Sequence, residues 1–299
     1  MWASAPTGEQ SRGGKRMKIT VLAENTSACG LPAEHGLSLF VEAAGRRFLF
    51  DTGASGLFAR NADALGIDLD GAEFAVLSHG HNDHGGGLGT FFERNAHAPV
   101  YASRWAFEPH YNASDKDIGL DPALLDTGRF VLVDRDLQIS EGLTLYPACG
   151  STPTVAPAIC WPLPADGPTS SVAPAICRPL PAFDPGGLKT IRNGRLIPED
   201  FRHEQYLLVE ENGRRVLFSG CSHRGVLNLM RRFRPDVLIG GFHFFRLPLN
   251  DALAASAAAL DACPASYYTC HCTGEAQYAF LKERMKNLHY LSTGVSVEV

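Results

Sequence analysis

Three histidines and one aspartate lie within six residues of each other in the segment HGHNDH, at positions 79–84. Neutral imidazole and carboxylate groups are ligands that Zn²⁺, Mn²⁺ and Fe²⁺ accept in proteins. The spacing lets His79 and His81 converge on one ion, whereas Asp83 and His84 can turn toward a second ion nearby. Hydrogen-bonded histidines in an ordinary turn are the alternative interpretation. The segment predicts a site for two divalent ions, with Zn²⁺ favoured and Mn²⁺ or Fe²⁺ as alternatives.

Two ions held close together define the chemistry that we expect here. They would share a water molecule and lower its pKa, so that a metal-bound hydroxide becomes the nucleophile. Asp83 would bind an ion and also orient that hydroxide. The ions would act as Lewis acids on a carbonyl or phosphoryl oxygen and stabilise the charge that develops there. Hydrolysis of an ester, a lactone or a phosphoester is the natural reaction for such a site.

Apolar segments of strand length recur along the chain, and several of them run into polar or glycine-rich residues. Strand-like segments cover 17–24, 37–42, 46–53, 74–77, 99–107, 129–134, 236–243 and 265–274. Residues 206–223 read as a hairpin with Asn212-Gly213 at its tip. Helical spacing marks residues 57–67, 226–233, 251–260 and 275–288. Strands alternate with helices in both halves, which predicts helices outside a β core and strand ends that deliver polar residues to one rim.

These motifs together resemble the metallo-β-lactamase superfamily of metal-dependent hydrolases, over residues 17–299 apart from one proline-rich excursion. The supporting pieces are AEHGLSLFVE at 33–42, FDTG at 50–53, SHGHNDHGGGL at 78–88, SGCSH at 219–223, GGFH at 240–243 and HCTG at 271–274. They resemble in particular the branch of 7,8-dihydropterin-6-yl-methyl-4-(β-D-ribofuranosyl)aminobenzene 5'-phosphate synthase. The resemblance implies an α/β fold, namely an αββα sandwich of two mixed sheets with helices outside.

The resemblance also implies roles for individual residues. The first-metal ligands would be His79, His81 and His223, and the second-metal ligands would be Asp83, His84 and His271. Cys221 occupies the place of an aspartate that bridges the metals in many members. An inert buried cysteine is the favoured interpretation, and a thiolate ligand is the alternative. His203, ahead of the hairpin, is a weaker candidate ligand. Asp51 would accept a hydrogen bond that orients a ligand.

Other polar residues near these motifs have weaker signals. His243, after two glycines at a strand end, is predicted to face the substrate as a hydrogen-bond donor or acid, so that Asp83 and His243 are the candidate catalytic residues. His35 resembles a feature of the branch near the rim and receives no chemical role. Cys270 and Cys272 are expected to point away from His271 if that segment stays extended. The remaining histidines, at 97, 110 and 289, have no motif around them.

Composition excludes several classes of protein. The 299 residues are 45% hydrophobic and 20% charged, with a formal net charge of -5, which is typical of a globular protein and argues against nucleic-acid binding through a positive field. An apolar run long enough to span a bilayer is absent from the sequence, so we expect no membrane partner. Eight cysteines are too dilute for a disulfide scaffold, and the start lacks a signal-peptide pattern. We therefore expect a cytoplasmic protein with reduced thiols.

The domain organisation has two irregular parts. Residues 1–16 are predicted to be a disordered leader or tag, and residues 17–299 a single domain. VAPAIC occurs at 155–160 and again at 172–177, within a proline-rich insertion at about 151–187. Two copies are too few to stack a core, so the insertion is interpreted as a surface excursion.

The function that follows is a dinuclear metal-dependent hydrolase or transferase acting on a small phosphorylated or ester substrate. For the synthase-like branch the implied reaction is a transfer at a phosphorylated pterin precursor, in which the metals activate a leaving pyrophosphate. The alternative is a non-catalytic, metal-dependent protein that binds or senses a small molecule. The sequence leaves the oligomeric state open.

Overall fold

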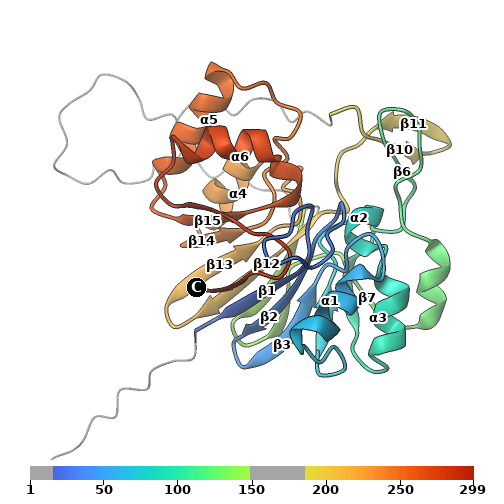
Figure 1. Cartoon of the computed structure of the whole chain (residues 1–299). Helices are drawn as coiled ribbons and strands as arrows, with labels where there is room; N and C mark the ends of the chain where they lie inside the picture. Colours follow the sequence, from blue (N-terminus) through green and yellow to red (C-terminus); the bar gives the residue numbers. More distant parts are fainter. Residues whose placement is uncertain (1–15, 149–185) are drawn as a thin grey trace, which may run out of the picture.

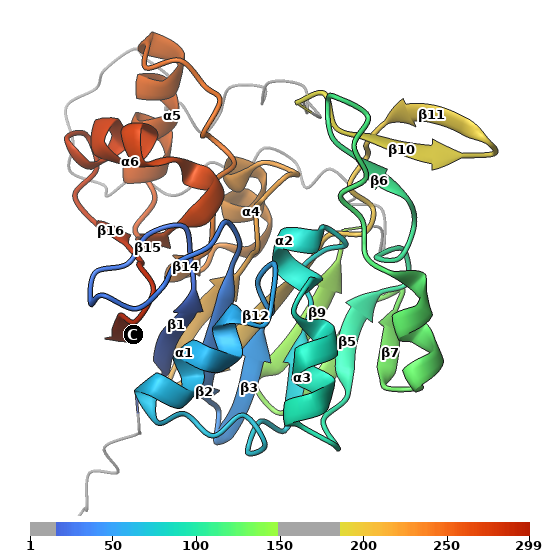
Figure 2. The same cartoon turned by 45° about the vertical axis from the view of Figure 1, so that its right-hand side comes forward.

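The computed structural model describes residues 16–148 and 186–299. Nearly all of the expected leader at 1–16 and of the proline-rich insertion at 151–187 lies outside these residues. In the described part, two seven-stranded sheets face each other and helices cover their outer surfaces (Figure 1). A third sheet of three short strands stands beyond them (Figure 2).

The first sheet is formed by the N-terminal half of the chain and by the last strand. Its strands, in spatial order, are β17 (Ser296–Glu298), β1 (Lys18–Ala23), β2 (Ser38–Ala43), β3 (Arg46–Phe50), β4 (Phe74–Val76), β5 (Val100–Ser103) and β7 (Phe130–Val133). β17, β1, β2 and β3 pair antiparallel, whereas β3, β4, β5 and β7 pair parallel. The sheet is therefore mixed, as the sequence predicts.

The second sheet repeats this arrangement. Its strands, in spatial order, are β16 (Leu288–Tyr290), β15 (Ser266–Thr269), β14 (Val237–Ile239), β13 (Arg214–Phe218), β12 (Gln205–Glu211), β9 (Leu143–Pro147) and β8 (Leu137–Ser140). β13 to β16 pair parallel, and the other pairs are antiparallel. Asn212 and Gly213 both have positive φ at the tip of the β12–β13 hairpin, which is the geometry of a tight two-residue turn.

The helices lie on the two outer faces of the sandwich. They are α1 (Leu57–Leu65), α2 (Asn82–Gly85), α3 (Leu88–Arg94), α4 (Val226–Phe233), α5 (Asp251–Asp261) and α6 (Glu275–Lys282), with 3-10 turns η1 (Pro122–Thr127) and η3 (His271–Thr273). α1 and α3 cover the first sheet, and α4, α5 and α6 cover the second (Figures 1 and 2). The last helix ends six residues earlier than its sequence pattern suggests. Among the described residues, every helix is too short or too polar to cross a bilayer.

The apolar core has three layers because the strands are apolar on both faces. Phe48 and Phe50 of β3 face the second sheet and contact Phe218 of β13, whereas Leu49 between them packs under the outer helices. Successive side chains of a strand point to opposite faces, so a strand covered on both sides is a continuous apolar run. This burial fixes the register of the strands and thereby the position of the residues that follow them.

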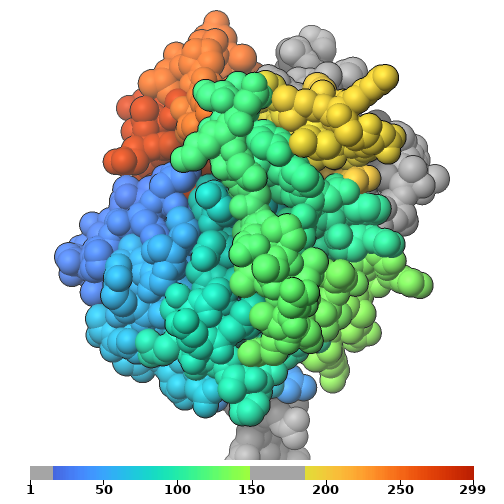
Figure 3. Space-filling view, turned by 90° about the vertical axis from the view of Figure 1, so that its right-hand side faces the viewer, coloured from blue at the N-terminus to red at the C-terminus, as the bar shows by residue number. Residues whose placement is uncertain are grey.

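The third sheet was not predicted from the sequence. It contains β11 (Arg195–Pro198), β10 (Lys189–Arg192) and β6 (His110–Tyr111). Its residues are mostly polar, and Leu196 is 47% exposed, so the alternating pattern of a half-buried strand is weak. Figure 3 shows the β10–β11 hairpin in yellow beside the green segment around β6, both projecting beyond the rim of the sandwich.

Candidate metal centre

The expected ligands gather at one rim of the sandwich, where parallel strands of both sheets end. Residues 78–84 follow β4 in the first sheet, and residues 219–223 follow β13 in the second. His243 comes after β14 and His271 comes after β15. The carboxyl ends of parallel strands meet at the same edge of a sheet. The two facing sheets therefore bring chain segments nearly 200 residues apart into contact.

Hydrogen bonds fix the protonated nitrogen of His79. The hydroxyl of Ser78 donates its proton to Oδ2 of Asp51 over 2.7 Å. The Oγ atom of Ser78 can therefore only accept a hydrogen bond from the ring of His79. Nδ1 of His79 lies 2.8 Å from the same Oγ, and it therefore carries the proton. In the neutral ring, Nε2 is left with a free lone pair. Burial holds the pKa of His79 well below its usual value, which favours the neutral form.

His84 and His271 are oriented in the same way by different partners. Nδ1 of His84 lies 2.6 Å from Oδ2 of Asp51, and Nδ1 of His271 lies 2.8 Å from Oδ1 of Asn25. When Asp51 is ionised, both oxygens can only accept, so in the neutral rings each Nδ1 carries the proton and each Nε2 presents a lone pair. Burial itself raises the pKa of Asp51 well above its usual value. Burial lowers the pKa of His84 to about 3. Asp51 thus has the orienting position that the sequence predicts, and Asn25 is a partner that sequence reasoning missed.

The Nε2 atoms of His84 and His271 lie only 3.3 Å apart and are both buried. In neutral rings with the proton on Nδ1, two lone pairs face each other at this distance and repel. A cation between them removes that repulsion. Tetrahedral Zn²⁺ with nitrogens at about 2.0–2.1 Å places two of them about 3.3–3.4 Å apart, so this donor pair fits a metal ion. Asp83 adds an oxygen, because its Oδ2 lies 3.3 Å from Nε2 of His271.

The predicted first-metal residues form a separate group, the first group, beside the second group of Asp83, His84 and His271. One ligand atom from each of His79, His81 and His223 lies within 4.8 Å of the others, and all three side chains are buried. Nε2 of His79 and Nε2 of His223 are 3.3 Å apart. Burial keeps the pKa of His81 and His223 well below the usual value, so these rings are also neutral ligands. The residues present therefore fit two divalent ions, one in each group.

Asp83 is the charged member of the second group. Burial alone would raise its pKa, but the neighbouring rings of His84, His271 and His35 hold the pKa well below the usual range. Nε2 of His35 lies 3.3 Å from Oδ2 of Asp83, although the side chain of His35 is 68% exposed. His35, to which the sequence gave no chemical role, therefore contacts a candidate ligand at the rim.

Cys221 lies between the two groups of ligands. Its Sγ is 3.1 Å from Nε2 of His84, and it also groups with His79 on one side and with His271 and Cys272 on the other. The thiol therefore lies between the two groups, where the resemblance implies a bridging group. Burial raises the pKa of the Cys221 thiol well above its usual range, so the metal-free protein holds a neutral thiol here.

The expectation that Cys272 points away from His271 is wrong. It assumed an extended segment, whereas residues 271–273 form the 3-10 turn η3 and His271 has a φ of 49°. The turn carries Cys272 back toward the site, where its Sγ lies 3.5 Å from the backbone oxygen of Cys221. Gly241 makes room for that sulfur, because a Cβ there would lie 2.2 Å from it.

Cobalt substitution would decide whether Cys221 binds metal. We expect the Co²⁺-loaded protein to show a near-ultraviolet sulfur-to-cobalt charge-transfer band that Cys221→Ser removes, because Sγ lies 3.1 Å from the lone pair of His84. Cys270→Ser is the matched control, since Cys270 is equally buried but belongs to none of the metal-holding groups found among the described residues. A band that survives in Cys221→Ser and disappears in Cys272→Ser would move the ligand to Cys272.

His203 does not have the proton arrangement of a ligand. The backbone N–H of Gly80 donates to Nδ1 of His203 over 2.9 Å, so in the neutral ring the proton lies on Nε2. Burial keeps the pKa of His203 well below its usual value. His203 is thus a hydrogen-bond donor beside the site. His110, which has no motif, lies 1% exposed next to it, with ring centroids 4.0 Å apart.

His243 lies at the open side of the first-metal group. Its ring centroid is 4.4 Å from that of His223, and its side chain is partly exposed. The backbone φ of 56° at His243 is a left-handed conformation that turns the chain sharply after β14. The structure therefore places His243 beside His223 of the first-metal group.

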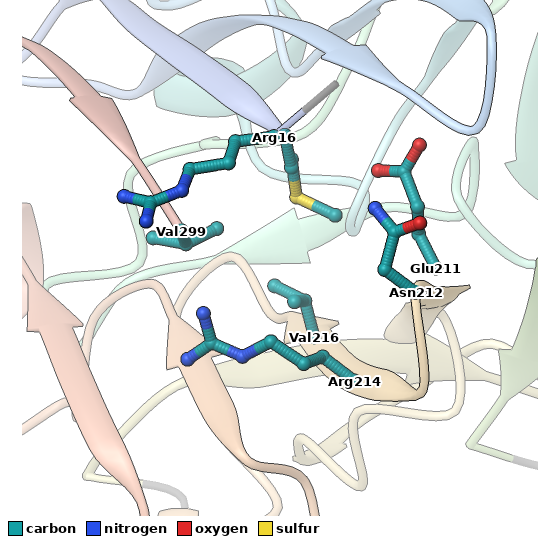
Figure 4. A pocket seen from close by; sticks show the side chains of 7 residues that line it. Arg16, Glu211, Asn212, Arg214, Val216 and Val299 are labelled. Atoms are coloured by element: carbon teal, nitrogen blue, oxygen red, sulfur yellow. The ribbon is translucent and has the colours of Figure 1, made fainter. Parts of the chain in front are cut away.

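A separate cavity lies at the opposite end of the sandwich, near the start of β1 and the β12–β13 turn. It has a volume of about 450 Å³ and is lined by Arg16, Met17, Glu211, Asn212, Arg214, Val216 and Val299 (Figure 4). Figure 4 shows Arg16 and Arg214 on either side of Val299. None of the candidate metal ligands contributes to this cavity.

Comparison with known proteins identifies the fold. The sequence model of the metallo-beta-lactamase superfamily matches residues 31–161. The crystal structure of Tm1679, described as a metal-dependent hydrolase of the beta-lactamase superfamily, superposes with a TM-score of 0.73 at 27% identity, over 95% of this chain and 99% of that chain. The chain has the metallo-β-lactamase fold, which confirms the αββα sandwich and the resemblance seen in its motifs.

Two proteins of the archaeon Methanocaldococcus jannaschii are similar to this chain in sequence. Its 7,8-dihydropterin-6-methyl-4-(beta-D-ribofuranosyl)-aminobenzene-5'-phosphate synthase is 26% identical over an alignment of 310 residues, covering 93% of this chain and 95% of the relative. An uncharacterized protein of the same organism, MJ0448, is 26% identical over 230 residues, covering 75% of this chain and 78% of that protein. The Zn²⁺-bound PqqB of Methylobacterium extorquens shares the fold alone, with a TM-score of 0.56 at 14% identity over 94% and 100% of the two chains.

Proposed function

We propose that the protein is a dinuclear metal-dependent enzyme that hydrolyses, or transfers a group from, a small phosphorylated or ester substrate. The observation that carries the proposal is the pair of buried Nε2 atoms of His84 and His271, 3.3 Å apart, beside the group of His79, His81 and His223. The hydrogen-bond partners at Nδ1 of the two rings leave each Nε2 available to bind a metal ion. Zn²⁺ is the favoured ion because the donors are imidazole nitrogens with a thiol between the groups.

When bound, two divalent ions would lower the pKa of a water molecule and polarise an ester or phosphoryl oxygen. Side chains at the rim would orient the attacking water and the leaving group. Asp83 faces both His271 and His35, so its carboxylate can accept a hydrogen bond from an attacking water at the rim. His243, partly exposed beside His223, can give a proton to a leaving oxygen on the other side.

A phosphorylated substrate would meet a cation at the same rim. Arg246 lies three residues after His243 and is exposed, with its guanidinium bound to the backbone oxygen of Gly186 and stacked on Phe245. The guanidinium has five N–H donors, so it can hold a phosphate and keep its present contact. The kinship to a phosphate-containing pterin synthase and to a metal-dependent hydrolase supports both reaction types, and neither relative decides between them.

Metal content and activity test this proposal together. We expect elemental analysis of the purified, Zn²⁺-supplemented protein to give about two ions per chain. We also expect chelation to remove activity on a panel of phosphoesters, lactones and pterin phosphates, and Zn²⁺, Mn²⁺ or Fe²⁺ to restore it. Metal loading near two with persistent inactivity across the panel would favour a binding or sensor protein. Loading of one ion or none would contradict the dinuclear site.

A further inference from the structure

Two glutamates with fully buried side chains accept hydrogen bonds from the backbone of candidate metal ligands. Oε1 of Glu204 accepts from the backbone N–H of His223 over 2.8 Å. Oε1 of Glu24 accepts from the backbone N–H of His271 over 2.6 Å. His223 belongs to the first group of ligands and His271 to the second. Each candidate ion therefore has one ligand whose backbone is held by a buried carboxyl group.

Both ligands lie at turns that the backbone does not favour by itself. The residue before His223, Ser222, has a φ of 55°, and His271 has a φ of 49°. Residues with a side chain rarely adopt this left-handed conformation. A hydrogen bond to the N–H at the turn fixes its shape, and with it the Cα position from which the imidazole extends.

The second oxygen of each carboxyl group also faces the backbone. Oε2 of Glu204 accepts from the backbone N–H of Arg224 over 3.1 Å and from the hydroxyl of Tyr206. Oε2 of Glu24 accepts from the backbone N–H and from the hydroxyl of Thr26, each over 2.7 Å. Backbone N–H groups donate at every pH, so these bonds do not depend on the protonation of any side chain.

The second ligand is held from the opposite sheet. Glu24 directly follows β1 of the first sheet, whereas His271 follows β15 of the second. The next residue, Asn25, places its Oδ1 2.8 Å from Nδ1 of the same histidine. Two adjacent residues thus contact the backbone and the ring of one ligand. Glu204, by contrast, lies just before β12 and reaches a turn of its own sheet.

We propose that Glu204 and Glu24 are positioning residues of the metal centre, Glu204 for the first ion and Glu24 for the second. Each fixes the turn that carries one histidine ligand, and neither touches an ion. Metal sites depend on such outer contacts, because a ligand that wanders must be ordered again when the ion binds. The inference rests on the proposed metal centre and assigns a separate support to each of its two halves.

Glu204→Gln and Glu24→Gln test the assignment as a pair. The amide has nearly the same shape but only one oxygen, so its N–H₂ faces a backbone N–H whichever way it turns. We expect each variant to lose at least about 10-fold in affinity for its own ion, as when other outer contacts of ligands are changed. The affinity for the other ion should stay as in the parent, so each variant is the matched control for the other.

Cadmium distinguishes the two ions. The ¹¹³Cd²⁺-loaded protein should give two NMR signals, which His81→Ala and His84→Ala assign to the first and the second group. Competition with a chelator, followed through both signals, then gives each affinity separately. A general loosening of the sandwich would lower both affinities in both variants. That result would overturn the proposal, as would two unchanged affinities in either variant.

A second measurement needs no variant and therefore does not depend on how the substitutions fold. NMR couplings across hydrogen bonds, recorded on the Zn²⁺-loaded protein, should join the amide nitrogen of His223 to Cδ of Glu204, and that of His271 to Cδ of Glu24. The bond from Ser219 N–H to the backbone oxygen of Ile239, at 2.9 Å, is the internal standard. Its coupling without the other two would overturn the proposal. Failure of the unsubstituted protein to give two cadmium signals would instead contradict the proposed function.

Discussion

His84→Ala is expected to reduce the bound metal from about two ions per chain to about one and to abolish most of the activity. Nε2 of His84 lies 3.1 Å from Sγ of Cys221 and 3.3 Å from Nε2 of His271. The substitution therefore removes a central nitrogen ligand from the second group. The first group keeps His79, His81 and His223. Elemental analysis after gel filtration measures the effect directly.

The matched control is His97→Ala, which removes an exposed imidazole that belongs to none of the candidate metal groups and should leave both ions bound. His84→Ala also deprives Asp51 of one hydrogen bond, so thermal unfolding of the metal-free variant must be compared with that of the metal-free parent. Two ions retained in a folded His84→Ala protein would contradict the ligand assignment. Loss of both ions would show that the groups bind cooperatively and would contradict two separate sites.

Gly240→Ala is expected to destabilise the protein by about 3 kcal/mol or more. Gly240 directly follows β14 with a φ of 137°, and a Cβ on it would lie 1.6 Å from the backbone oxygen of Ser219. Both obstacles belong to the backbone, so no side-chain movement can relieve them. The strain lies at the ends of β13 and β14, just before the segments that contain Cys221 and His243. Chemical denaturation with and without Zn²⁺ measures the loss.

Gly89→Ala is the control for this substitution. Gly89 lies inside α3, a Cβ there would contact no heavy atom within 4 Å, and alanine is favoured over glycine within a helix by about 1 kcal/mol. We therefore expect Gly89→Ala to be neutral or stabilising. A Gly240→Ala protein as stable as the parent would mean that the end of β14 can move away from Ser219.

Local patterns in the sequence predict most of the fold. Continuous apolar runs such as β3 and the alternation of strands with helices each arise from neighbouring residues. The turn at Asn212-Gly213 is equally local. The third sheet is not, because β6 contains two residues and pairs with a strand about 80 positions later. Its position depends on tertiary contacts that no short window of sequence contains.

Some residues of the site can likewise be predicted from local sequence, and others cannot. The segment from His79 to His84 can be recognised because its ligands are adjacent in sequence, and the structure brings His223 and His271 to it. Glu24 and Glu204 could not be recognised, because each is ordinary until the fold places its carboxyl group on the backbone of His271 or His223. The interpretation of Cys272 failed because it assumed extended backbone where the chain turns at His271.

The two halves of the sandwich contribute different ligands, since His79, His81, Asp83 and His84 follow a strand of the first sheet, whereas His223 and His271 follow strands of the second. Ion binding and association of the halves are therefore thermodynamically linked. A substitution between the sheets that loosens Phe48 against Phe218 would weaken metal affinity without touching a ligand. In the other direction, free metal concentration would set how tightly the halves hold together, so chelators would act on the whole domain.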